Sequence, residues 1–352
     1  MKAEMIEPDD ARPLLTIAIP TFNRASFLKE LLSVLFDQLI DEPRVEFIIS
    51  DNASPDETPA VVEEYRRRGL TIRSIRNETN IGSDANFLQC FEHARGKYFW
   101  LFSDDDIIVG GGVAKILRLL AMDDYALAFI CPFEFRRDYL AEKTTDKLGR
   151  IAQILPGGMQ IVRKAGTMIT FISALIVNKD YYSTINHPDL QEFIGTNLML
   201  LGWVCPILAE SKKNLIVWER LVAGRGDNSG GWSAGQVFGI NLQRVANTAF
   251  GNRRDMAAEL TNRTLRSWFP ETIMGTRRGT GKPLLKENLR EVMEPAYSTN
   301  WRYWIYVYPL IVLPLGMARA WYSIIKLTNR LSRSVSLLME YIFLQRDFLK
   351  ES

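Results

Sequence analysis

Short apolar runs alternate with amphipathic stretches over the first 125 residues of the chain. Runs rich in β-branched residues predict strands, and apolar residues that recur every three or four positions predict helices. The predicted strands are 15–20, 45–50, 70–75 and 98–102. The predicted helices begin at Ser26, near Pro59 and at Ser83. This alternation is typical of an α/β fold with a mostly parallel sheet flanked by helices.

The pattern is less regular in the rest of the chain. Residues 169–177 form a continuous apolar run and predict a further strand, and residues 253–295 carry mixed charges in a pattern typical of helices. We therefore divide the chain into four parts. They are an N-terminal tail (1–13), a first half-domain (14–125), a second half-domain (126–250) and a helical C-terminal region (251–352).

Polar residues follow each of the four predicted strands of the first half. They are Thr21, Asn23 and Arg24, then Asp51 and Asn52, then Arg76 and Asn77, and then Asp104, Asp105 and Asp106. Turn chemistry alone would explain each cluster, because Asn and Asp favour turns. In an open parallel sheet, however, the carboxyl ends of the strands are where ligands bind. Acids and guanidinium groups together suit a nucleotide diphosphate with a divalent cation.

Three consecutive carboxylates, Asp104, Asp105 and Asp106, stand at the end of the fourth predicted strand. Adjacent acids repel one another and are costly to desolvate, so their position beside an apolar run favours a bound cation. The alternative is a solvated turn whose charge is stabilised by the start of a helix.

The amino-acid composition limits which cations and which classes of binding partner the chain can have. The chain has 352 residues and a formal net charge of +2, which does not suggest a strongly basic nucleic-acid-binding protein. Three widely spaced cysteines and two histidines exclude a disulfide framework and a multi-histidine or zinc site. The absence of a Cys/His cluster agrees with a hard, oxygen-liganded cation, which suits carboxylates and phosphate. Residues 1–13 are charged and lack the apolar core of a signal peptide, so we expect a cytoplasmic protein.

Four motifs in order resemble the family-2 glycosyltransferases of the GT-A fold. They are Ile19–Arg24, Ser50–Thr58, Asn80–Gly82 and Ser103–Asp106. More loosely, the whole chain resembles the abequosyltransferase-like branch that builds bacterial O-antigen and related surface polysaccharides. The resemblance implies a GT-A, Rossmann-like sheet in which residues 14–125 bind the nucleotide sugar and residues 126–250 form the acceptor side.

The resemblance also implies roles for individual residues. Thr21 and Asp51 would line the pocket of the base, Arg76 or Asn77 would close it, and Asp104 would face the ribose. Asp105 would bind Mg²⁺ or Mn²⁺, and Asp106 would support the ion or the sugar. The remaining donor-binding candidates are Pro20, Asn23, Arg24 and Asn52. Ser103 stands where the family commonly has an acid, so the roles within the triplet could shift by one position.

The implied reaction is transfer of a sugar, with inversion, to an acceptor hydroxyl whose proton a base removes. Family members carry a Glu-Asp pair for this step, and the chain has none in the expected region. The candidates are Glu192 and Asp189, with His187 and Asp227 behind them. Asp189 could equally be a turn residue after Pro188.

Residues 303–325 have a composition that could allow contact with a membrane. Residues 303–318 are uncharged and rich in Trp and Tyr, but a spanning helix needs about 20 apolar residues, and this run is shorter and holds two prolines. We expect attachment to the membrane surface, with Lys326, Arg330 and Arg333 near anionic headgroups. A buried helical hairpin or a dimer contact is the alternative.

These observations favour a glycosyltransferase acting at the cytoplasmic face of the inner membrane on a glycan acceptor linked to polyprenyl diphosphate. Two alternatives stay open. A sugar nucleotidyltransferase would need a glycine-rich phosphate loop after the first strand, where this chain has Pro20–Asn23. A non-catalytic polysaccharide-assembly protein would explain the missing Glu-Asp pair but not the acid triplet.

Overall fold

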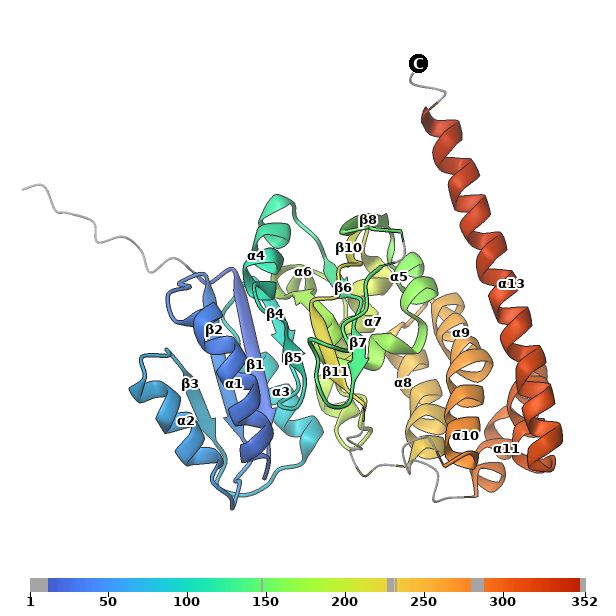
Figure 1. The fold of residues 1–352 in the computed structure, drawn as a ribbon, viewed down its shortest axis with the longest axis horizontal. Helices are drawn as coiled ribbons and strands as arrows, with labels where there is room; N and C mark the ends of the chain where they lie inside the picture. Colours follow the sequence, from blue (N-terminus) through green and yellow to red (C-terminus); the bar gives the residue numbers. More distant parts are fainter. Residues whose placement is uncertain (1–11, 147, 227–230, 232, 280–287, 349–352) are drawn as a thin grey trace, which may run out of the picture. The chain divides into compact units, whose positions relative to one another are not determined.

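The computed structural model describes residues 12–146, 148–226, 231, 233–279 and 288–348, with side chains as far as Leu331. Most of the predicted N-terminal tail, Asp227 and the side chain of Arg333 lie outside these residues. The chain divides into two compact units, Met1–Asn228 with Asn241–Leu260 and Ser229–Ile240 with Thr261–Ser352. Figure 1 shows the order of the helices and strands.

The first unit is built on a large sheet. Within the described residues this sheet has eight strands, in the order β3-β2-β1-β4-β9-β6-β10-β8. The strands are β1 (Leu15–Thr21), β2 (Val45–Asp51), β3 (Arg73–Arg76), β4 (Tyr98–Leu101), β6 (Leu127–Ile130), β8 (Ala152–Pro156), β9 (Leu175–Asn178) and β10 (Lys213–Val217). Pairing is parallel among β3, β2, β1 and β4 and between β6 and β10, whereas β9 and β8 run antiparallel to their neighbours. The predicted fold class is confirmed.

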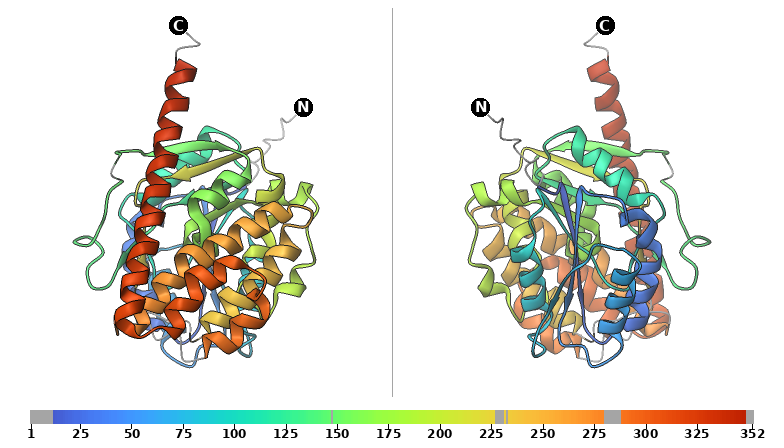
Figure 2. Two further views of the ribbon diagram at one scale, coloured as in Figure 1. Left: turned by 90° about the vertical axis from the view of Figure 1, so that its right-hand side faces the viewer. Right: turned by 90° about the vertical axis from the view of Figure 1, so that its left-hand side faces the viewer.

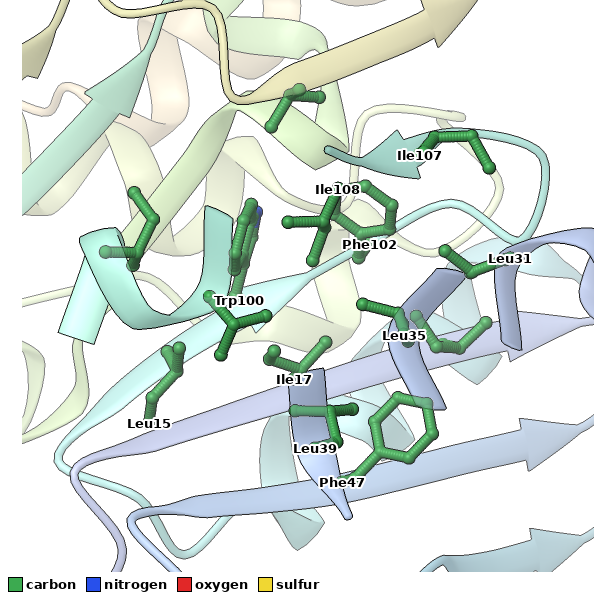
Figure 3. Close-up of a cluster of buried hydrophobic side chains, with 14 of the residues drawn as sticks. Leu15, Ile17, Leu31, Leu35, Leu39, Phe47, Trp100, Phe102, Ile107 and Ile108 are labelled. Atoms are coloured by element: carbon green, nitrogen blue, oxygen red, sulfur yellow. The ribbon is translucent and has the colours of Figure 1, made fainter. Parts of the chain in front are cut away.

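Helices cover both faces of this sheet (Figure 2). On one face lie α1 (Ala25–Leu39), α2 (Thr58–Arg67) and α4 (Gly112–Met122). Leu31 and Leu35 of α1 pack toward Ile17 and Phe47 of the sheet (Figure 3). Because side chains alternate along a strand, the other residues of the same strands face the opposite helices.

The opposite face is covered by α3 (Ser83–His93), α6 (Lys179–Thr184) and α7 (Leu201–Glu210). Phe91 of α3 stacks on Trp203 of α7 with ring centroids 4.7 Å apart, and it meets Phe99 of β4 edge-on at 5.2 Å. The first unit also contains α5 (Gly158–Ala165) and α8 (Leu242–Ala249).

Two predicted strands differ from the observed elements. Residues 169–177 form the 3₁₀ turns Gly166–Thr170 and Ile172–Ala174, and only Leu175–Asn178 forms a strand. The turn presents Ser173 to β4, where its carbonyl accepts a hydrogen bond from the buried Trp100 indole at 2.9 Å. Leu70 and Ile72 are buried as predicted, but strand pairing begins only at Arg73.

A small second sheet adjoins the end of β4. It has the order β5-β11-β7, with β5 (Ile107–Ile108), β7 (Phe133–Phe135) and β11 (Val222–Arg225). β11 pairs with β5, which directly follows the acid triplet. The small sheet therefore brings Gly224 and Arg225, from late in the chain, beside Asp106.

The second unit is helical. Its elements are α10 (Phe269–Arg277), α11 (Leu289–Tyr297), α12 (Tyr308–Val312) and α13 (Leu315–Phe348), and α9 (Arg254–Arg263) spans the boundary between the units. The apolar run at 303–318 is broken between Val312 and Leu315, where Pro314 interrupts the helical path. Among the described residues, no helix combines the length and apolarity needed to cross a bilayer.

Candidate functional site

The carboxyl ends of β1 and β4 form the point where the strand order of the sheet reverses, and ligands in open α/β sheets bind at such points. Pairing of β1 with β2 continues as far as Thr21 opposite Asp51. Pairing of β1 with β4 ends at Ala18 opposite Leu101. Pro20 lies two residues beyond Ala18 and so faces the same neighbour, but it has no N–H to donate. The two strands therefore separate at Pro20, which opens the sheet edge.

Thr21 and Arg24 hold the first acid of the triplet across this opening. The Thr21 hydroxyl donates to Asp104 Oδ2 at 2.7 Å, and Arg24 Nη1 donates to Asp104 Oδ1 at 2.9 Å. Asp104 is 3% exposed, whereas the Arg24 side chain is 30% exposed. Arg24 thus neutralises a buried carboxylate while part of its guanidinium still reaches solvent.

Asp51 and Arg76 form a second ion pair at the ends of β2 and β3. Arg76 Nη1 lies 2.8 Å from Asp51 Oδ2, and Arg76 Nη2 donates to the Ser54 carbonyl at 3.1 Å. The other Asp51 oxygen accepts from the Ser54 N–H at 2.8 Å. Asn23 has a left-handed backbone (φ 55°) that aims its N–H at the Ser54 hydroxyl, 2.9 Å away. The loop after β1 is thereby joined to the loop after β2.

An amide network closes the next corner. Asn52 Oδ1 accepts hydrogen bonds from Asn77 Nδ2 at 2.9 Å and from the Ile81 N–H at 3.0 Å. Asn52 Nδ2 donates to Asn80 Oδ1 at 2.8 Å. Both Asn52 and Asn77 therefore brace the turn between β3 and α3.

Asp106 anchors the small sheet. Its Oδ2 accepts from the Ser173 hydroxyl at 2.6 Å, and its Oδ1 accepts from the Arg225 N–H at 2.9 Å. A Cβ on Gly224 would lie 2.9 Å from the Phe171 ring, so a larger residue would force the ring or β11 to shift. The sequence analysis missed Ser173, because it lies inside the run read as a strand.

Arg225 lies in β11, against the triplet. Its Nε donates to the Asp105 carbonyl at 3.1 Å, and its Nη2 lies 2.6 Å from Glu30. The guanidinium sits 5.1 Å from the ring centroid of Phe27 and 4.6 Å from that of Phe135. A second fixed cation therefore borders the acids, on the side away from β2.

Burial and mutual repulsion disfavour the charged forms of Asp104 and Asp106. Burial raises the pKa of Asp104 to about 6, with the charge of Arg24 opposing the rise. Burial, helped by the charge of Asp105, raises the pKa of Asp106 to about 8. A divalent cation beside them would favour the charged forms.

The carboxylates diverge from one another. Asp104 turns to Thr21 and Arg24, while Asp106 turns to Ser173 and Arg225. Asp105 accepts from the Ser103 hydroxyl, lies 3.6 Å from Arg24 and is the most exposed of the three acids at 8%. No cluster of three or more His, Cys, Asp or Glu suited to hold a metal occurs in the described part of the chain. The donor set nevertheless fits Mg²⁺ or Mn²⁺, which bind through one or two carboxylates when a diphosphate supplies further oxygens.

Asp84 joins the second half-domain (126–250) to this sheet edge. It stands in the first turn of α3 and accepts hydrogen bonds from the backbone N–H groups of Asn197, at 2.8 Å, and Met199, at 3.4 Å. Burial raises the pKa of Asp84, and the backbone donors oppose that rise. The sequence analysis missed Asp84, whose signal in the sequence is an acid in the first turn of a helix.

The two candidate bases have different surroundings. Asp189 caps the 3₁₀ turn Leu190–Phe193, where its carboxylate accepts from the Gln191 N–H at 3.0 Å. Glu192 lies in the first turn of the same element and is exposed. Both precede the segment that Asp84 anchors. Capping this turn gives Asp189 a structural role. Among the described residues, the Glu192 side chain has no comparable structural role.

The structure thus brings most of the predicted site residues to one sheet edge. Those that converge there are Thr21, Asn23, Arg24, Asp51, Asn52, Arg76, Asn77, Asp104, Asp105 and Asp106. Pro20 is buried in β1 and shapes the opening rather than lining it. Asp189 and Glu192 take no part in the described hydrogen-bond network of this edge.

Comparison with known proteins agrees with this geometry. The model of glycosyl transferase family 2 matches residues 16–176. The chain is 30% identical to the abequosyltransferase RfbV of Salmonella typhimurium, over 52% of this chain and 58% of that protein. It is 25% identical to a GalNAc(5)-diNAcBac-PP-undecaprenol β-1,3-glucosyltransferase of Campylobacter jejuni, over 54% and 59%. The chain thus matches little more than half the length of these relatives.

Solved structures show the same fold. Residues 1–349 of S. aureus TarS in complex with UDP-GlcNAc align with a TM-score of 0.55 at 16% identity, covering 90% of this chain and 92% of that one. A further crystal structure of the same TarS fragment gives a TM-score of 0.56. The GT-A prediction is confirmed. The segment that matches the family model, residues 16–176, contains β1, β2, β3, β4 and the acid triplet.

Proposed function

We propose that the protein transfers a sugar from a nucleotide diphosphate sugar to a hydroxyl of a glycan acceptor. One observation carries this proposal: the Thr21–Asp104–Arg24 cluster and the Asp51–Arg76 pair meet where β1 and β4 separate. The buried carboxylates there can accept hydrogen bonds from the N–H groups of a base and from the hydroxyl groups of a ribose. The partly exposed arginines can donate hydrogen bonds to phosphate oxygens. The family match and the transferase relatives support the reaction class.

Mg²⁺ or Mn²⁺ would be held by Asp105, with Asp106 as a supporting residue. Asp105 is the most exposed of the three acids, at 8%, which favours it as the direct ligand. When bound, the ion would act as a Lewis acid that stabilises the departing diphosphate. Arg24 would neutralise the carboxylate of Asp104 and place a positive charge beside the phosphates of the donor. Inversion by a single displacement follows from the family resemblance, with Glu192 as the proposed base.

The acceptor is proposed to be a glycan on a polyprenyl diphosphate carrier, and the protein to work at the cytoplasmic face of the inner membrane. The Campylobacter relative is named for a glycan linked to undecaprenol, and the Salmonella relative is named as an abequosyltransferase. This part of the proposal concerns bacterial surface polysaccharide synthesis of the O-antigen kind.

A thermal-shift screen of nucleoside diphosphates, each with and without Mn²⁺, tests the donor site. A ligand at 100 times its dissociation constant stabilises the folded state by about 2.7 kcal/mol. We expect one nucleotide to raise the melting temperature only with Mn²⁺, and Asp105→Asn to abolish that shift. Asp180→Asn, an exposed acid paired with Arg12, is the matched control. No Mn²⁺-dependent shift with any nucleotide would refute the proposal.

A sugar nucleotidyltransferase is tested by a separate reaction. Incubation with nucleoside triphosphates and sugar 1-phosphates would release pyrophosphate if that activity were present. We expect none, because Pro20–Asn23 replace the glycine-rich phosphate loop that such an enzyme needs after its first strand.

A further inference from the structure

The second unit carries a basic groove between α10 and α13 with a volume of about 520 Å³. Arg266, Lys326 and Arg330 line it, and Glu271 is the carboxylate among its lining residues. Positive charge therefore exceeds negative charge in a concave surface. Such a groove is complementary to an anionic group.

Arg266 provides the strongest sign of a missing ligand. Its Nε is buried and has no hydrogen-bond partner among the described residues. The Asn329 side chain donates to the Arg266 carbonyl at 3.1 Å, which holds Arg266 against α13. A buried donor without an acceptor is unfavourable, and a phosphate oxygen would supply the acceptor.

The outward side of α13 is apolar. Met317, Ile324, Leu327 and Leu331 are 59%, 51%, 57% and 57% exposed. Their spacing places them on one stripe of the helix. Tyr322, on the packed side, is 8% exposed. An exposed apolar stripe of this kind marks an interaction surface.

Cations border the apolar stripe. Arg319, Lys326 and Arg330 are exposed and are spaced to lie along one flank of α13. Lys326 and Leu327 both line the groove, so the apolar stripe and the basic groove are continuous. An apolar face flanked by Lys and Arg is the pattern of helices that lie in a membrane interface.

The segment that precedes α13 carries exposed aromatic side chains. Trp301 and Trp304 are 53% and 38% exposed. The Trp321 indole donates to the Ile305 carbonyl at 2.8 Å, which holds the preceding helical turn against α13. Trp is favoured at the level of lipid headgroups.

We propose that the basic groove and the apolar stripe together form a membrane-binding surface for anionic lipids. The phosphate of a lipid headgroup occupies the groove, and Leu327 and Leu331 enter the boundary between headgroups and acyl chains. The excess of cations selects an anionic lipid over an apolar protein partner. This inference deepens the proposed function and rests on it, because an acceptor carried on a lipid must be met at a membrane.

The test is co-sedimentation of the full chain with vesicles of phosphatidylcholine alone or mixed with phosphatidylglycerol. We expect binding to the mixed vesicles that weakens as salt rises. Lys326→Glu with Arg330→Glu should lower the partition coefficient by roughly tenfold or more, since each cation near an anionic surface contributes to attraction. Leu327→Asp with Leu331→Asp should lower it as well.

Arg118→Glu and Met122→Asp are the matched controls, since both residues are exposed on α4 of the first unit. They should leave vesicle binding unchanged. Inorganic phosphate at millimolar concentration should not release the protein from the vesicles. Release by phosphate would assign the groove to a free anion and overturn the lipid assignment.

Two other results would also overturn the inference. One is vesicle binding that is absent, or that the charge and leucine variants leave unchanged. The other is a dimer in solution that Leu327→Asp dissociates while the protein ignores vesicles, which would assign the stripe to a second copy. The Mn²⁺-dependent nucleotide shift is measured without vesicles, so its failure would reject the proposed function separately.

Discussion

The Asp84 carboxylate accepts a hydrogen bond from the Asn197 N–H at 2.8 Å, joining the first turn of α3 to the segment that leads into α7. Asn197 has a left-handed backbone (φ 57°), so this segment depends on outside support. The buried acid thereby fixes the segment before α7 to α3.

Asp84→Asn should therefore separate transfer from donor binding. The amide keeps the volume but loses one acceptor, which leaves a backbone N–H unpaired at a cost of about 1–3 kcal/mol. We expect lower kcat, an unchanged nucleotide dissociation constant by calorimetry, and reduced stability in urea unfolding. Asp180→Asn, at an exposed ion pair, should change stability by less than about 1 kcal/mol. Equal losses in both variants would rule out the anchoring role.

Arg76→Ala should weaken donor binding specifically. The arginine holds Asp51 and the Ser54 carbonyl at the carboxyl end of β3. We expect roughly a tenfold rise in the KM for the nucleotide sugar, as for loss of a charged hydrogen bond worth about 1.5–3 kcal/mol. The control lies in the same strand: Arg73 pairs with Glu46 at 2.9 Å, at the opposite end of β3. Arg73→Ala should leave KM unchanged, and a similar rise there would show a general effect on the strand.

Glu192→Gln should lower kcat by about 10²–10⁴, the usual contribution of general base catalysis, without loss of donor binding. Asp189→Asn should remain active, because Asn caps helical turns about as well as Asp. Single-turnover assays with radiolabelled donor would measure both. Full activity in Glu192→Gln would remove this residue as the base.

Gly224→Ala should destabilise the fold and disturb the triplet. The added methyl would lie 2.9 Å from the Phe171 ring and close to Asp106, and overpacking of this kind costs about 1–3 kcal/mol. Gly110→Ala is the control, since a Cβ there meets nothing within 4 Å. Urea unfolding should distinguish the two variants, and the same stability in both would mean that β11 yields easily.

Local pattern was sufficient to predict the first half of the fold. β1, β2 and β4 lie within a residue or two of their predicted bounds, because apolar period and turn residues specify them locally. The convergence of Thr21, Asp51 and Asp104 also followed from sequence, since parallel strands end at one edge of a sheet. Residues 169–177 were the failure: hydrogen bonds from Trp100 and to Asp106 hold Ser173 in a turn, and no local signal reveals such distant partners.

The amino-acid sequence by itself determined that acids and arginines would stand at the ends of four strands, because the apolar period of each strand and the polar residues that follow it are local properties. Only the tertiary structure decided the division of labour among the acids. Asp104 turns to Arg24, and Asp106 turns to Ser173 and Arg225 of the second half-domain. The three acids are neighbours in the sequence but have different hydrogen-bond partners, because groups as many as 119 residues away bind individual carboxylates.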